Sequence, residues 1–359
     1  MTPQPITIED IQAAAARIHV HRTPVMTSSL LDLFASDNCQ WPIELYFKCE
    51  PLQKTGSFKI RGATNAVNLL SNNEAAKGVV THSSGNHAQA LAKAALDRGI
   101  PAYVVMPNNA PQVKKDAVRG YGGKVIECEP TLEARETMAK KVIQDTGATF
   151  IHPFNNVNVM AGQGTLALEF IAQTNEEGTK LDCLIAPVGG GGMLSGCAVT
   201  AKTIGSNLAV FGAEPEMVND TYRSFYANNN DEDELVLTTN DDIKKRRRHQ
   251  RQCNQVGATS VADGLLTNVG ELTYPILVDH VDDIFTVTEQ QIIQAMQLFW
   301  SRAKLCIEPS AAVGLAVALY NKDFHKLVKE KQLKRIGIVL SGGNVDYSRA
   351  IALFEKYAL

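Results

Sequence analysis

The sequence lacks an excess of positive charge. It contains 35 Lys and Arg against 38 Asp and Glu, which gives a formal net charge of −3. Binding to nucleic acid through its phosphates usually needs a basic surface. We therefore expect no nucleic-acid partner.

Long apolar runs and paired cysteine motifs are also missing. No stretch reaches the roughly eighteen apolar residues of a membrane span, and the N-terminal residues Met-Thr-Pro-Gln-Pro contain no basic start followed by an apolar stretch. The seven cysteines are odd in number and show no C-x-x-C spacing. We expect a cytoplasmic protein with reduced thiols and no membrane contact.

The pattern along the chain is that of an α/β protein. The 359 residues are enough for two domains. From Gly78 onward, β-rich runs alternate with helical periodicity, which is typical of βαβ units and a parallel sheet. Thr7 and Asp10 resemble a capping box that starts an N-terminal helix. The expected strands are 79–81, 103–106, 124–128, 149–152, 181–188, 209–213 and 335–340, and the expected helices are 87–98, 113–121, 132–146, 164–173, 193–204, 289–305 and 311–320.

One segment, 228–251, breaks this pattern. It holds an acidic run followed by the basic run 244–248. A basic run can be a polyanion-binding patch, but with acids just upstream a solvated surface loop is the favoured interpretation. We assign it no function.

Four consecutive glycines follow the expected strand 181–188. Gly189–Gly192 lead into a helix, so bare backbone N–H groups converge at a helix N-terminus, which favours an anion. The same turn can serve packing alone. No Gly-Lys-Ser/Thr follows, and the spacing G-x-G-x-x-G is not met, so neither a nucleoside-triphosphatase loop nor a dinucleotide-binding loop is indicated.

Lys59 lies where a turn enters a helix. Ser57 is the expected N-cap, which places Lys59 in the first turn, where the positive helix end disfavours an ammonium ion. A neutral amine is the form that condenses with an aldehyde. The alternative is an ordinary solvated lysine.

Several motifs together resemble the serine/threonine dehydratase and serine racemase family of pyridoxal-phosphate (PLP) enzymes. They occur in that family's order and span about residues 23 to 346: 55–63 around Lys59, 81–90, 161–165, the tetraglycine with Met193-Leu194, and 340–346. The resemblance implies fold type II: two open, twisted, mostly parallel sheets flanked by helices, with a small domain (80–152) inserted in a large PLP-binding domain (1–79 and 153–359).

The resemblance also implies a role for each motif residue. Lys59 would bind the cofactor covalently, Phe58 would pack on its ring, and Ser341 would face its pyridine nitrogen. Asn86 would bind the cofactor's 3-hydroxyl, and the substrate carboxylate would bind at the start of the following helix. The phosphate would be held by Gly189, Gly190, Gly191 and Gly192, and Met193 would also contact the cofactor. The substrate would be bound by Ser83, Ser84, Gly85, Asn86, His87 and Arg135.

Ser84 distinguishes two activities within the family. Racemisation removes a proton from one face of Cα and returns it on the other, so two proton carriers must flank the substrate. Racemase-like members carry a serine at the position of Ser84 opposite the lysine, whereas many threonine dehydratases have alanine. We expect a serine racemase with dehydratase activity. A dedicated serine/threonine or threo-3-hydroxyaspartate dehydratase is the alternative, and Arg135 could attract such an acidic substrate.

Two further sites are implied by the resemblance. Glu214, the Val218 carbonyl and Asp220 would bind Mg²⁺, or Ca²⁺ or Mn²⁺ in its place. A homodimer is expected, with an ATP effector site at its interface that is formed by Ser28, Ser29, Leu30, Lys54, Thr55, Tyr121, Arg302, Lys304 and Asn344.

Two hypotheses come from other classes of protein. A noncatalytic amino-acid or nucleotide sensor on the same scaffold would lack the covalent cofactor. A dinucleotide-dependent oxidoreductase would need the glycine spacing that this chain lacks.

Overall fold

A computed structural model describes residues 5–205, 207–226, 251–254 and 257–357. The charged segment 228–250, which the sequence predicts to be a surface loop, lies outside these residues. The described strands form two sheets, of six and four strands. The α/β class and the two mostly parallel sheets expected from the sequence are confirmed.

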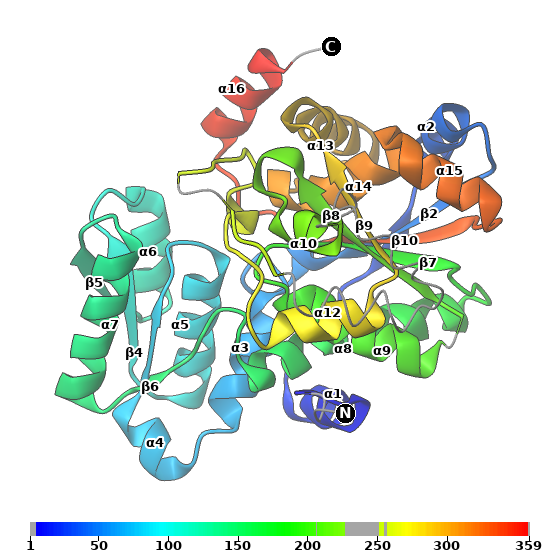
Figure 1. The fold of residues 1–359 in the computed structure, drawn as a ribbon. Helices are drawn as coiled ribbons and strands as arrows, with labels where there is room; N and C mark the ends of the chain where they lie inside the picture. The colour runs from blue at the N-terminus through cyan, green and yellow to red at the C-terminus, as the bar shows by residue number, and fades with distance from the viewer. Residues whose placement is uncertain (1–4, 206, 227–250, 255–256, 358–359) are drawn as a thin grey trace, which may run out of the picture.

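The smaller sheet is entirely parallel and has the order β5-β4-β3-β6. Apolar residues of α7 cover one of its faces, and those of α5 and α6 cover the other. With these helices and α4 it forms the four-stranded unit on the left of Figure 1. Its elements are β3 (Val79–His82), β4 (Ala102–Pro107), β5 (Lys124–Cys128), β6 (Thr149–Phe150), α4 (Asn72–Lys77), α5 (Asn86–Arg98), α6 (Gln112–Gly120) and α7 (Leu132–Thr146).

The larger sheet has the order β1-β2-β10-β7-β8-β9, and only β1 runs antiparallel to its neighbour among these strands. The central strands β7 and β10 carry continuous apolar runs, which is typical of a parallel sheet buried on both faces. The strands of this sheet are β1 (Val25–Thr27), β2 (Glu44–Cys49), β7 (Cys183–Pro187), β8 (Ala209–Pro215), β9 (Asp283–Val287) and β10 (Arg335–Leu340).

Helices bury both faces of this sheet. One apolar core joins it to α2 (Ser29–Cys39), α13 (Glu289–Ala303), α14 (Pro309–Tyr320) and α15 (Lys322–Glu330). A second core joins the opposite face to α8 (Val157–Glu176), α9 (Gly192–Ile204) and α12 (Thr273–His280). The remaining helices are α1 (Ile8–Arg17), α3 (Lys59–Asn68), α10 (Asp220–Tyr226) and α16 (Tyr347–Lys356).

Glycines let α8 approach two other helices closely. A Cβ on Gly162 would lie 2.7 Å from the Arg61 carbonyl of α3, and one on Gly196 of α9 would lie 2.5 Å from the backbone nitrogen of Gly164. Helix α8 begins at Val157, where the Asn156 side chain caps it by accepting from the Val159 N–H at 3.0 Å, so the predicted start at Gly164 is wrong. The motif 161–165 has a packing function here.

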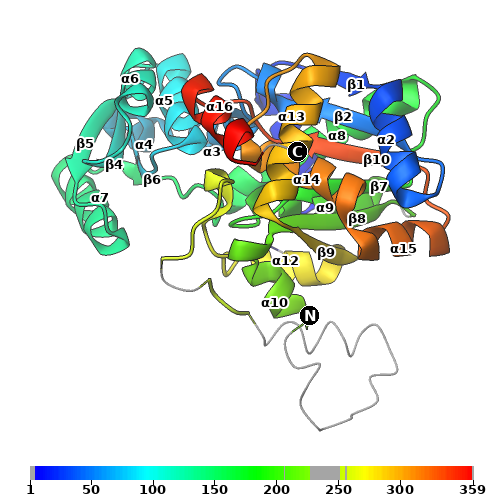
Figure 2. The same cartoon turned by 90° about the horizontal axis from the view of Figure 1, so that it is seen from above.

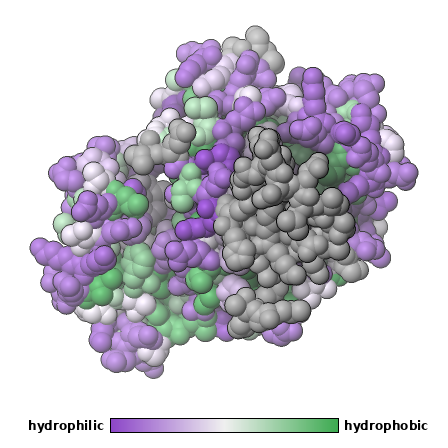
Figure 3. Space-filling model, viewed as in Figure 1, coloured by the Kyte–Doolittle hydropathy of each residue, from purple (hydrophilic) through white to green (hydrophobic). Residues whose placement is uncertain are grey.

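Helix α16 lies between the four-stranded unit and α13 (Figure 1, Figure 2). Trp300 of α13 makes edge contacts with Tyr347 and Phe354 of α16. On the face shown in Figure 3, hydrophilic side chains cover most of the outer edge. Within the part of the chain that the structure describes, no helix is both long and apolar enough to cross a membrane.

Candidate active site

A cleft of about 1330 Å³ lies between the four-stranded unit and the larger sheet. Both sides contribute to its walls, because β3, α5 and α7 face the loops that follow β7 and β10. The residues that the sequence predicted for cofactor and substrate binding all line it: Phe58, Lys59, Ser83, Ser84, Gly85, Asn86, His87, Arg135, Gly189, Gly190, Gly191, Gly192, Met193 and Ser341.

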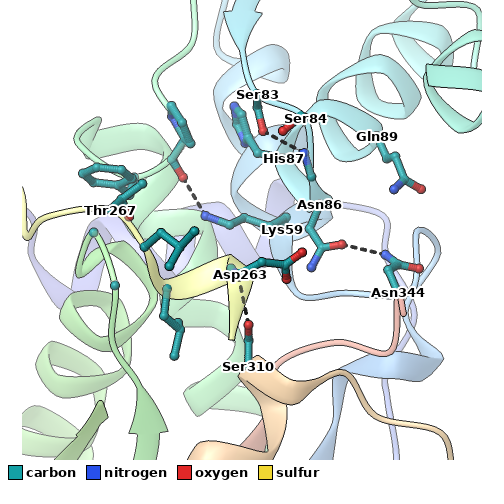
Figure 4. Close-up of a pocket in the computed structure, with 18 of the residues that line it drawn as sticks. Lys59, Ser83, Ser84, Asn86, His87, Gln89, Asp263, Thr267, Ser310 and Asn344 are labelled. Atoms are coloured by element: carbon teal, nitrogen blue, oxygen red, sulfur yellow. Dashed lines mark hydrogen bonds between the residues drawn. The ribbon is translucent and has the colours of Figure 1, made fainter. Parts of the chain in front are cut away.

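Lys59 is the first residue of α3, and its amine lies deep in this cleft although part of the side chain stays accessible. Its Nζ donates a hydrogen bond to the Pro153 carbonyl at 3.0 Å (Figure 4). Burial lowers the pKa of Lys59 to about 8, and the nearby Glu308 carboxylate opposes this shift. At neutral pH, Lys59 therefore has a much larger neutral fraction than a solvated lysine, and the neutral amine is the form that its proposed chemistry requires.

The predicted N-cap at Ser57 is wrong. Phe58 occupies the N-cap position of α3, and no side chain caps the helix. Ser57 instead pairs with Gly342 through a β-bridge, and the Phe58 N–H donates to the Ser341 carbonyl at 3.0 Å. The end of β10 thus holds the turn before Lys59, and Ser341 lies beside that turn.

Neighbouring residues pack closely against the tetraglycine loop Gly189–Gly192. Gly191 has φ of +85°, and a Cβ there would lie 2.8 Å from Thr273 Oγ1. A Cβ on Gly189 would lie 3.0 Å from Leu265 Cα. The chain therefore needs glycine at these positions for conformation and for packing, and α9 begins at the last glycine with its N-terminus toward the cleft. This geometry suits a bound phosphate.

Ser83 and Ser84 lie on the opposite side of the Lys59 side chain from Asp263 and Ser310 (Figure 4). They connect the end of β3 to α5, whose N-cap is Gly85. The Gly85 N–H donates to Ser83 Oγ at 3.3 Å. A carboxylate is favoured at such a helix N-terminus.

His87, in the first turn of α5, is buried at 2% exposure. Its Nε2 lies 3.2 Å from the Ile151 carbonyl, and within the described structure no partner was found for its Nδ1. Burial, with the charge of Lys59, lowers the pKa of His87 to about 3. The ring is therefore neutral at neutral pH and carries its hydrogen on Nε2.

No sequence motif predicted a role for Glu308, which is buried at the start of α14. Asn86 Nδ2 donates to its Oε1 and Oε2 at 2.9 and 3.2 Å. Asn86 Oδ1 in turn accepts from Asn344 Nδ2 at 2.8 Å. Burial raises the pKa of Glu308 to about 7. An acidic residue just before Pro309 was the only signal in the sequence, and its burial depends on tertiary contacts.

Two histidines that no sequence motif predicted, His82 and His152, line the cleft together with Arg135. Burial lowers the pKa of both, that of His152 to about 4, and the charge of Arg135 contributes at His82. His152 Nδ1 accepts from the backbone N–H of Asn155 at 2.9 Å, which leaves its hydrogen on Nε2. Arg135 is half-buried, and its Nε donates to the Thr131 carbonyl at 3.3 Å.

At the mouth of the cleft, Asp263 connects three elements. It accepts from Lys114 of α6 at 3.2 Å and from Arg349 of α16 at 2.8 Å. These ion pairs join the four-stranded unit and the C-terminal helix to the short 3-10 helix Asp263–Leu265. The cleft is therefore bridged on the side of α16.

The predicted metal ligands lie near one another, away from the cleft. Glu214 and Asp220 are both fully buried, and burial together with their mutual repulsion raises the pKa of Glu214. Glu214 accepts from the Tyr222 N–H at 2.7 Å, and Asp220 accepts from the Val269 N–H at 2.7 Å. Val218, which lies between Glu214 and Asp220 in the sequence, is also buried. Among the described residues, no group of three or more His, Cys, Asp or Glu side chains could hold a metal ion.

The nine residues predicted for the nucleotide are spread over several elements. Ser28, Ser29 and Leu30 start α2, Arg302 and Lys304 end α13, and Tyr121 follows α6. Asn344 Nδ2 donates to the Thr55 carbonyl at 2.8 Å, whereas Lys54 Nζ donates to the His19 carbonyl at 2.6 Å.

Comparison with known proteins adds three findings. The model of a family described as pyridoxal-phosphate dependent enzymes matches residues 16–342. A serine racemase from Dictyostelium discoideum is 46% identical over 346 residues, 96% of each chain, and a beta-hydroxyaspartate dehydratase from Paracoccus denitrificans is 44% identical over 345 residues, 96% of this chain and 98% of the relative. The solved structure of maize serine racemase superposes with a TM-score of 0.85 at 38% identity, covering 98% of each chain.

Proposed function

Because the chain belongs to the family of pyridoxal-phosphate-dependent enzymes, we propose that it interconverts L- and D-serine and also dehydrates serine to pyruvate and ammonia. The chain is an enzyme of the racemase and ammonia-lyase group, to which its relatives belong.

The cleft fits pyridoxal phosphate. The glycine loop, where a side chain at Gly189 or Gly191 would collide with neighbours, offers bare N–H groups and a helix N-terminus for the phosphate. The amine that would bind the aldehyde, Lys59, lies in the same cleft with a lowered pKa. When bound, the cofactor supplies an electron sink for the electron pair left when the Cα proton is removed.

One observation carries the racemase proposal: Lys59 and Ser84 line the same cleft from different elements. The Lys59 amine would remove or return the Cα proton on one face, and the Ser84 hydroxyl would do so on the other. Ser83 and the first N–H groups of α5 would orient the substrate carboxylate between them. Elimination needs only one of the two proton carriers, so both activities are compatible with this site.

A single assay tests this function. Purified protein supplied with pyridoxal phosphate is incubated with L-serine, and D-serine and pyruvate are measured separately. Formation of both supports the proposal, and pyruvate without D-serine indicates a dehydratase. A protein that stays colourless with the cofactor, with no label fixed on Lys59 by borohydride, would indicate a noncatalytic sensor.

The presence of Arg135 in the cleft favours a second class of substrate. Arg135 and His82 both line the cleft, and Arg135 could pair with a second carboxylate of a substrate. We therefore propose 3-hydroxyaspartate as a further substrate for dehydration. The test measures kcat/KM for threo-3-hydroxyaspartate and for serine in the wild type and in Arg135→Met. The substitution should lower kcat/KM for threo-3-hydroxyaspartate but not for serine.

The finer assignments of metal, effector and assembly are also proposals. Mg²⁺ or Ca²⁺ at Glu214, the Val218 carbonyl and Asp220 would relieve the repulsion between the two buried carboxylates. A homodimer is supported by the exposed Leu30, Leu33 and Phe34 on α2, and ATP would bind where the dimer brings the nine dispersed residues together. All seven cysteines are unpaired, which suits a cytoplasmic location. Sedimentation with and without Mg·ATP tests the assembly.

A further inference from the structure

Arg61 lies in the first turn of α3, two residues after Lys59. A cation is unfavourable there because the helix N-terminus carries partial positive charge. Arg61 is nevertheless only 1% exposed and is among the largest fully buried side chains. Such a residue needs strong compensation from its surroundings.

Two carboxylates provide that compensation. Arg61 Nε and Nη2 donate to the two oxygens of Glu50, each at 2.8 Å. Its Nη1 and Nη2 donate to the two oxygens of Glu169, each at 3.1 Å. Both pairs are two-pronged, which fixes the plane and the position of the guanidinium group.

Lys48 of β2 completes the group. Its Nζ donates to Glu169 at 2.5 Å, to Gln173 at 2.6 Å and to the Thr23 carbonyl at 2.7 Å. We call Lys48, Glu50, Arg61 and Glu169 the ion quartet. It contains two cations and two carboxylates, so its formal charges cancel, and Glu169 is its most accessible side chain at 17%.

The ion quartet links the two ends of the segment that carries Lys59. Glu50 lies where β2 ends, and Arg61 lies just beyond Lys59, so their ion pair joins the two ends of residues 50–61. The same segment is held from the other side, since the Gly343 N–H donates to the Gly56 carbonyl at 2.9 Å. Both sides of the turn before Lys59 are therefore restrained.

Helix geometry relates Arg61 to the direction of Lys59. Residues two apart on an α-helix point about 200° apart around its axis. Because Arg61 is fixed toward the interior between Glu50 and Glu169, Lys59 projects on the opposite side, into the cleft. A rotation of the first turn would require the buried ion pairs to break.

We propose that Arg61 is a positioning residue, whose ion pairs with Glu50 and Glu169 hold the Lys59 amine where it meets the cofactor's aldehyde. A well-packed apolar side chain is often no less stable than a buried ion pair. The fixed geometry of the guanidinium fork therefore accounts for an arginine here. This inference depends on the assignment of Lys59 proposed above.

The test removes the fork without leaving an unbalanced buried charge. In the double variant Arg61→Met with Glu50→Gln, Lys48 and Glu169 remain as one cation and one carboxylate. The melting temperature should stay close to that of the wild type. In the cofactor-free protein, amide hydrogen exchange across 56–60 should accelerate, and the rate of pyridoxal-phosphate attachment to Lys59 should fall about 100-fold.

Arg61→Lys is the second variant, because lysine keeps the charge but cannot form the fork. Its attachment rate should lie between those of the wild type and the double variant, whereas a role of charge alone predicts a wild-type rate. Attachment is measured by borohydride fixation and peptide mass spectrometry, so it does not depend on turnover.

A surface pair offers the matched control. Arg22 Nη2 lies 2.6 Å from Glu176 at the C-terminal end of α8, and the two side chains are 56% and 61% exposed. Arg22→Met with Glu176→Gln should leave exchange and attachment unchanged. Wild-type attachment and exchange in the Arg61/Glu50 variant would overturn the inference.

The inference and the proposed reaction fail in different ways. If the wild type attaches the cofactor at Lys59 but does not convert serine, the proposed reaction is wrong, and the Arg61 test still decides the positioning role. If the wild type attaches it to another lysine, the assignment of Lys59 and the inference are both wrong.

Discussion

The Asn86 side-chain amide donates to both carboxylate oxygens of Glu308, at 2.9 and 3.2 Å. Asn86 is the residue proposed to bind the cofactor's 3-hydroxyl, and Glu308 is also the charge that acts on the amine of Lys59. Glu308 therefore connects two groups proposed for cofactor binding. Because burial raises its pKa to about 7, its charge changes within the physiological range.

We predict that Glu308→Gln makes the cofactor-free protein more stable at pH 8 than the wild type, but not at pH 5. The folded state holds a proton on Glu308 up to about pH 7, whereas an unfolded glutamate loses it near pH 4.3. The folded state thus binds more protons between these values, so the wild type loses stability as pH rises through this window. The loss should be of order 1–3 kcal/mol.

Thermal unfolding of both proteins at pH 5 and pH 8 measures this difference. Glu330→Gln is the control, because Glu330 is exposed and lies 3.9 Å from Lys326 in an ordinary helical pair. Its effect should be the same at both pH values. A Glu308→Gln effect that does not change with pH would contradict the prediction.

Cofactor capture by the apoprotein should depend on the protonation of Lys59. Only the neutral amine attacks an aldehyde, so the capture rate should rise with pH and level off above about 8, the pKa to which burial lowers Lys59. Glu308→Gln should move the midpoint to lower pH, because the Glu308 charge raises the pKa of Lys59. Rapid-mixing absorbance measures the rate. A midpoint near the reference value of about 10.4 would mean that the amine is solvated.

Ser84→Ala should separate the two activities. Without the hydroxyl, no side chain at position 84 can return a proton on that face, and the loss of one general acid–base group typically costs about 100- to 10,000-fold. Racemisation of serine should fall by that amount while pyruvate formation stays within a few-fold. Ser83→Ala, at the neighbouring position proposed for substrate binding, should lower both rates together. Unchanged D-serine formation in Ser84→Ala would refute the two-base assignment.

Chelation should destabilise the protein if the Glu214 site binds a cation. A ligand at 100 times its dissociation constant stabilises by about 2.7 kcal/mol. Adding Mg²⁺ or Ca²⁺ to chelator-treated protein should therefore raise its melting temperature, and Glu214→Gln should abolish the response. If neither chelation nor added Mg²⁺ or Ca²⁺ changes the melting temperature of the wild type, the Glu214 site does not bind these cations.

The sequence predicted the elements with strong periodicity well. Helix 132–146 and strands 124–128 and 335–340 have the bounds observed in the structure. Strand β2 was not predicted, because Lys48 interrupts its apolar pattern. The structure buries Lys48 by pairing it with Glu169, which lies 121 residues away, and no local pattern contains that contact.

The residues of the candidate site also divide into those that a local motif reveals and those that depend on distant contacts. Lys59, the glycines and Ser341 could be found because they form contiguous motifs with a physical meaning. Glu308 and His152 could not, since each is an isolated polar residue whose role comes from burial beside the cleft. The wrong N-cap at Ser57 has the same origin, because Gly342, its partner, comes from the other end of the chain.

Two glycines allow the requirement for the glycine loop to be measured. Gly191 and Gly178 both have positive φ, +85° and +75°, so alanine costs roughly 1–2 kcal/mol of backbone strain at either position. At Gly178 an added Cβ meets no atom within 4 Å, whereas at Gly191 it would lie 2.8 Å from Thr273 Oγ1. Thr273 donates to the Gly190 carbonyl at 2.7 Å, so displacing it would also move the loop.

Gly191→Ala should therefore lose cofactor affinity and more stability than Gly178→Ala, which should bind pyridoxal phosphate as the wild type does. Fluorescence titration gives the dissociation constants, and thermal unfolding of the apoproteins gives the stabilities. If the two variants lose similar stability but only Gly191→Ala loses affinity, backbone strain alone does not explain the lost affinity. The shape of the glycine loop is then what phosphate binding requires. Equal affinities in the two variants would show that the phosphate is bound elsewhere.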